Sequence, residues 1–82
     1  MSPIDKDPNS GMNAALAATL RAERAAKRMT IDQLADRSGI PKRTLIRLIN
    51  AERSLNIEHA VSLAEALDLP IEILIERAKA RL

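Results

Sequence analysis

Apolar residues recur with the period of an α-helix along most of the chain, and short polar breaks divide them into five segments. Residues 13–28 are rich in Ala, Leu and Arg and contain no helix breaker, which favours a first helix. Four further helices are predicted over residues 31–38, 41–50, 57–68 and 70–82. The pattern therefore predicts an all-α protein with the architecture of a compact five-helix bundle.

The clearest local signals surround the start and end of the second helix. Thr30 and Gln33 match a capping box, in which each side chain satisfies the backbone N–H of the other residue. Met29 and Leu34 occupy the positions of a hydrophobic staple at the same helix start. Gly39 is suited to end the helix, because glycine adopts the left-handed conformation without strain. Two short helices are therefore predicted to meet at Gly39.

The third helix divides its residues between two opposite faces. At about 100° per residue, one face carries Leu45, Leu48 and Ile49. The opposite face carries a largely polar set: Arg43, Ile46, Arg47 and Asn50. This face is free from packing, and a rigid helix that carries arginine there is suited to the major groove of DNA.

Length and composition favour a single domain. The chain has 82 residues, which leaves no room for a second core. Residues 1–12 hold prolines, acids and a glycine without periodicity, which predicts a flexible N-terminal arm before a domain over residues 13–82. The sequence has no Cys and no apolar run long enough to span a bilayer. We therefore expect a cytoplasmic protein, in the bacterial nucleoid or the cytoplasm of a phage-infected host.

Basic charge is concentrated around the second and third helices. Residues 21–53 hold nine Lys or Arg and four Asp or Glu, a net charge of +5, whereas residues 54–82 have a net charge of −2. A basic centre suits a polyanion partner. Solvated helix surfaces also carry such charge, so charge alone does not decide between these two interpretations.

From Leu20 to Leu74 the sequence resembles the Xre/Cro-type helix-turn-helix domain of phage repressors and bacterial regulators. The matching positions are Thr30, Leu34-Ala35, Gly39-Ile40, Leu45, Leu48 and the run Leu63-Ala64-x-x-Leu67. The resemblance implies a lambda-repressor-like DNA-binding fold, with the third helix in the major groove of a double-stranded DNA operator. It also implies a homodimeric, sequence-specific transcriptional regulator of a pseudo-palindromic operator, such as a phage-type repressor or a Cro-like protein.

The resemblance assigns DNA contacts residue by residue. It implies that four side chains of the third helix face base edges: Lys42, Arg43, Ile46 and Arg47. Four others are implied to contact the DNA backbone: Thr30, Thr44, Asn50 and Arg53. Separately, the apolar stripe of the last helix offers candidates for a dimer seam: Ile75, Ala78 and Leu82.

Three positions depart from the pattern of the family. Ile31 replaces a glutamine that touches phosphate in many members, and isoleucine cannot make that contact. Ile49 replaces an acid that pairs with an arginine of the first helix, which leaves Arg24 to turn to solvent, to Glu52 or to the DNA backbone. Ala51 replaces a glycine that commonly follows the third helix, which predicts a slightly longer helix.

Other functions receive less support from the sequence. His59 has no Cys and no second His to complete a metal site, and no arrangement of nucleophile, base or phosphate-binding loop indicates catalysis. We therefore expect neither an enzyme nor a bound cofactor or metal. Two related alternatives stay open: an antitoxin that binds a toxin and controls its own operon, and the DNA-reading domain of a longer regulator. A protein partner would then be a toxin or an antirepressor.

Overall fold

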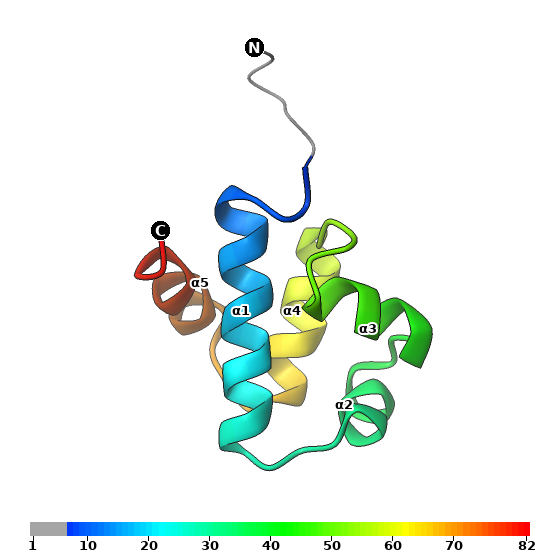
Figure 1. Cartoon of the computed structure of the whole chain (residues 1–82). Helices are drawn as coiled ribbons and strands as arrows, with labels where there is room; N and C mark the ends of the chain where they lie inside the picture. Colours follow the sequence, from blue (N-terminus) through cyan, green and yellow to red (C-terminus); the bar gives the residue numbers. More distant parts are fainter. Residues whose placement is uncertain (1–6) are drawn as a thin grey trace.

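The computed structural model describes residues 7–82, which form five α-helices and no β-strand (Figure 1). The helices are α1 (Gly11–Ala26), α2 (Ile31–Ser38), α3 (Lys42–Ile49), α4 (Ile57–Ala66) and α5 (Ile71–Lys79). The all-α five-helix bundle expected from the sequence is therefore confirmed. Among these residues, no helix combines the length and the apolarity needed to cross a bilayer.

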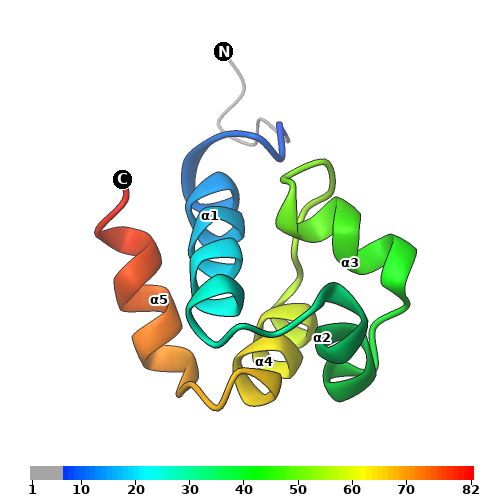
Figure 2. The same cartoon turned by 60° about the horizontal axis from the view of Figure 1, so that its bottom comes forward.

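Helix α1 lies between α5 on one side and α3 on the other, and α4 packs against α2 and α5 (Figure 1 and Figure 2). All five helices contribute fully buried leucines to one core: Leu20, Leu34, Leu45, Leu48, Leu63, Leu67 and Leu74. Removing such a side chain from water contributes about 1.5–3 kcal/mol. Helices α2 and α3 have only eight residues each, so this core, rather than their own helix propensity, holds them in place.

The first helix begins at Gly11 rather than at residue 13, so residues 11 and 12 belong to α1 and not to a flexible arm. The side chain of Asn13 explains why the chain is ordered at this point. Its amide donates to the carbonyl of Pro8 at 2.6 Å, and its side-chain oxygen accepts from the N–H of Leu55 at 2.8 Å. These bonds tie the start of α1 to the residues before it and to the loop between α3 and α4. Residues 1–6 of the predicted arm lie outside the described residues.

Three helices end with a residue other than glycine in the left-handed conformation: Arg28 after α1, Ala51 after α3 and Asp68 after α4. At the end of α3, the N–H of Glu52 donates to the carbonyl of Arg47 at 2.9 Å. The N–H of Ala51 donates to the carbonyl of Leu48 at 3.2 Å, which completes a Schellman motif. The expectation of a longer third helix is therefore wrong, because Ala51 adopts a φ of 57°, as glycine would.

Replacing Arg28 by glycine is expected to raise the free energy of unfolding by about 0.5–1 kcal/mol, because the left-handed conformation strains any residue with a Cβ atom. Arg28 is exposed and has a φ of 53°. Lys27→Gly is the matched control: it removes the same charge at an exposed position where φ is −89°, and it should lower stability. Thermal unfolding followed by far-ultraviolet circular dichroism measures both effects, and equal melting temperatures for the two variants would contradict the prediction.

Candidate nucleic-acid interface

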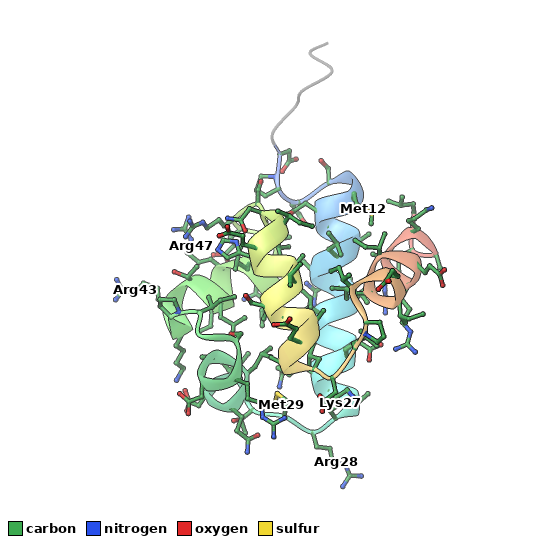
Figure 3. All side chains as sticks on the ribbon, turned by 180° about the vertical axis from the view of Figure 1, so that it is seen from behind. Met12, Lys27, Arg28, Met29, Arg43 and Arg47 are labelled. Carbon is green, nitrogen blue, oxygen red and sulfur yellow. The ribbon has the colours of Figure 1, made fainter. Side chains whose placement is uncertain are left out.

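The outward face of α3 collects the four side chains that the sequence predicted to read bases. All four are exposed to solvent: Lys42, Arg43, Ile46 and Arg47. The opposite face of the helix is buried in the core, as the two stripes of the sequence predicted. Figure 3 shows Arg43 and Arg47 extending outward on the α3 side of the molecule, away from α5. Ile46, which is 37% exposed, gives this cationic face an apolar element.

The cations of this face differ in their partners. Lys42 Nζ lies 3.0 Å from Asp32 Oδ1, which forms an ion pair between the first turn of α3 and the first turn of α2. Within residues 7–82, neither Arg43 nor Arg47 forms an ion pair or a side-chain hydrogen bond. Their guanidinium groups therefore keep all their donors available, in the forked geometry that matches the O6 and N7 acceptors of guanine.

The residues predicted to contact the DNA backbone are distributed around this face. Thr30 is the N-cap of α2 and is exposed; its hydroxyl accepts from the N–H of Gln33 at 3.0 Å, and the Gln33 side chain accepts from the N–H of Thr30 at 2.9 Å. The capping box expected from the sequence is thereby confirmed. Asn50 and Arg53 are exposed at and after the end of α3, whereas Thr44 is half-buried. Three of the four side chains are thus accessible to a ligand.

A side chain of α1 holds the end of α3, and the sequence did not predict this contact. Arg21 Nη1 donates to the backbone carbonyl of Ile49 at 2.6 Å. Since Ile49 is the last residue of α3, the bond joins that end of the helix directly to α1. Every residue has a backbone carbonyl, so the sequence does not indicate which one accepts from Arg21, and only the fold could reveal this partner.

Arg24 and Ile31 serve the fold rather than the interface. Arg24 Nη1 donates to the backbone carbonyl of Met29 at 2.8 Å, in the loop between α1 and α2. Of the three partners expected for Arg24, Glu52 is not used, since the two side chains form no ion pair within residues 7–82; the loop carbonyl takes one of the donors of Arg24 instead. Ile31 is partly buried and packs against the core, which accounts for an apolar residue at the start of α2.

Helix α5 is docked onto α1, and this docking corrects one predicted site residue. Ala78 is fully buried within the single chain, so it is not available to a dimer seam. The helical period identifies an apolar stripe but does not say that α1 of the same chain covers it. Arg81 Nε also donates to the buried hydroxyl of Thr19 at 2.9 Å. Of the other seam candidates, Ile75 is half-buried and Leu82 is 71% exposed.

His59 has a local structural role at the start of α4. Its N–H donates to the side-chain oxygen of Asn56 at 2.7 Å, and its Nδ1 accepts from the N–H of Asn56 at 3.3 Å. These bonds form a capping box in which histidine takes the place of the usual acid or amide. In the part of the chain that the structure describes, no three His, Cys, Asp or Glu side chains are grouped so as to hold a metal ion.

A short helix ended by Gly39, followed by a second helix with an exposed cationic face, defines a helix-turn-helix protein. A helix-turn-helix family model matches residues 20–74, about two-thirds of the chain. The chain belongs to this family, which is of the Xre/Cro type.

Two solved structures of the clp gene regulator ClgR from Corynebacterium glutamicum are similar to this chain. In one, the identity is 26% and the TM-score 0.83, over 89% of this chain and 95% of that one. In the other, the identity is 27% and the TM-score 0.82, over 90% of this chain and 79% of that one. Among curated proteins, none matches the sequence.

Proposed function

We propose that this protein is a sequence-specific transcriptional regulator that inserts α3 into the major groove of double-stranded DNA. The outward face of α3 carries the proposal, since it combines Arg43 and Arg47, both without a partner in residues 7–82, with the exposed Ile46. Arginine recognises guanine, and an apolar side chain contacts the methyl group of thymine. Membership of the helix-turn-helix family and the likeness to a clp gene regulator support a DNA-binding transcriptional regulator.

In this proposal the exposed polar residues around α3 bind phosphates. Thr30, Asn50 and Arg53 lie at the start of α2, at the end of α3 and just after it. Such contacts fix the position of the protein on the duplex without reading its sequence. Thr44 contributes less, because it is half-buried.

The finer proposal is a repressor of the phage or Cro-like type that acts as a homodimer on a pseudo-palindromic operator in the cytoplasm. The proposed seam is the outer side of α5 around the half-buried Ile75, together with the exposed Leu82 that follows the helix. Helix α5 lies across α1 from α3, so a two-fold axis beside α5 puts both copies of α3 on the flanks of the dimer (Figure 2). Half-sites lie about 34–36 Å apart, so each copy of α3 has to lie about 17–18 Å from the two-fold axis.

Selection of bound duplexes from a random DNA pool tests this function. We expect an enriched motif with two-fold symmetry and at least one guanine in each half. The logarithm of the binding constant should fall with the logarithm of salt concentration, with a slope of about −0.9 for each phosphate contact. A pool without enrichment, or binding insensitive to salt, would overturn the DNA-binding function. A motif consisting of one half-site would overturn the dimer alone.

A further inference from the structure

The ion pair between Asp32 and Lys42 joins the two helices of the helix-turn-helix at the edge of the proposed reading face. The atoms Asp32 Oδ1 and Lys42 Nζ are 3.0 Å apart, and both side chains are largely exposed, at 74% and 56%. Asp32 lies in the first turn of α2 and Lys42 is the first residue of α3. The pair therefore places a carboxylate at the end of a surface that otherwise presents cations to DNA.

This carboxylate acts on Lys42 and not on its neighbours. A lysine side chain is a flexible stem with a point charge, which can follow phosphates in any register. The ion pair with Asp32 favours one position of the ammonium group over others, and the remaining donors of this group stay free for an acceptor on DNA. Arg43 and Arg47 have no such partner among the described residues. One cation of the face is thus restrained while two remain free.

From this arrangement we infer that Asp32 is a specificity-determining residue, and the inference rests on the DNA-binding function proposed above. Sequence-independent affinity depends on the number of cations that can reach phosphates. Asp32 lowers this sequence-independent affinity in two ways: it holds Lys42, and it repels phosphates beside α2. On the operator, the restrained ammonium is already placed for one contact and loses little freedom when it binds. Asp32 therefore increases the difference in binding affinity between operator and random DNA.

Asp36 provides a matched control in the same helix. It is an exposed aspartate one turn further along α2, and it forms no ion pair within residues 7–82. Both Asp32→Asn and Asp36→Asn remove one negative charge from α2. Only Asp32→Asn also releases Lys42, so a comparison of the two separates the ion pair from the net charge of the protein.

The experiment measures dissociation constants of the full chain for its selected duplex and for a shuffled duplex of equal length. Asp32→Asn is expected to strengthen binding to the shuffled duplex. The ratio of the dissociation constant for the shuffled duplex to that for the selected duplex should therefore fall by about three- to tenfold. Asp36→Asn should leave the ratio within about twofold of the parent. In a Lys42→Gln background, Asp32→Asn should lower this ratio clearly less, because only the direct repulsion between Asp32 and phosphates is then removed.

Two results would overturn the role of Asp32: an equal loss of discrimination in Asp32→Asn and Asp36→Asn, or an undiminished effect of Asp32→Asn in the Lys42→Gln background. The first result would mean that the net charge of the protein accounts for the whole effect. The second would show that Lys42 is not the group through which Asp32 acts. A parent protein that prefers no duplex would instead overturn the proposed function. That failure appears before any variant is made and is therefore distinct.

Discussion

Arg47→Ala is expected to reduce the discrimination between operator and random DNA by about 5- to 150-fold, the equivalent of about 1–3 kcal/mol for a bidentate base contact. Arg47 lies on the exposed face of α3, and its guanidinium has no partner in residues 7–82. Alanine removes the contact and leaves the acceptors of the guanine unpaired. The core face of α3 is untouched, so the melting temperature should stay close to that of the parent. Titration of matched operator and shuffled duplexes measures the change.

Two control variants separate base reading from charge. Arg53→Ala removes an exposed cation after α3 that is proposed to bind phosphate; it should weaken operator and random binding alike and reduce the salt slope by about one. Lys79→Ala removes the same charge from α5, on the other side of α1, and should leave both constants nearly unchanged. If Arg47→Ala behaves like either control, with discrimination intact, Arg47 does not read a base.

Local signals in the sequence were sufficient for most of the fold. The capping box of Thr30 and Gln33 marked the start of α2, and Gly39 marked its end, because each requires only neighbouring residues. The two opposed stripes of α3 identified the buried face and the exposed face, since helical geometry fixes the relative direction of side chains. These elements also contain the proposed reading residues, which is why this part of the site could be predicted.

Contacts between distant segments could not be predicted in the same way. Arg21 donates to the backbone carbonyl of Ile49, and Asn13 bonds to the backbone of Leu55, so neither partner is marked by its side chain. The ion pair of Asp32 with Lys42 depends on the angle between α2 and α3, which the pattern does not specify. The same holds for Ala78: the apolar stripe indicates that this side of the helix packs against a neighbour, but it does not indicate whether the neighbour is α1 of the same chain or a second chain.

Ala78→Asp is expected to unfold the protein rather than to separate a dimer. Ala78 is fully buried, with no exposed surface, on the helix that packs against α1. An aspartate there would bury an unpaired charge, which costs several kcal/mol even after the surroundings relax. A domain of this size has a total stability of about 4–12 kcal/mol, so the substitution removes much or all of it. Circular dichroism near 222 nm should show loss of helix at about 25 °C.

Ala80→Asp is the matched control, because it introduces the same side chain at an exposed position two residues further along, just after α5. This variant should keep the helical signal of the parent and melt within a few degrees of it, about 1 kcal/mol or less. Since the chain has no Trp, Tyr or Phe, concentrations are measured by refractive index. If Ala78→Asp were instead a folded monomer while the parent was a dimer, the alanine would line the seam between two chains. The helix would then pack against a partner and not against α1, and the assignment of α5 to the core would be wrong.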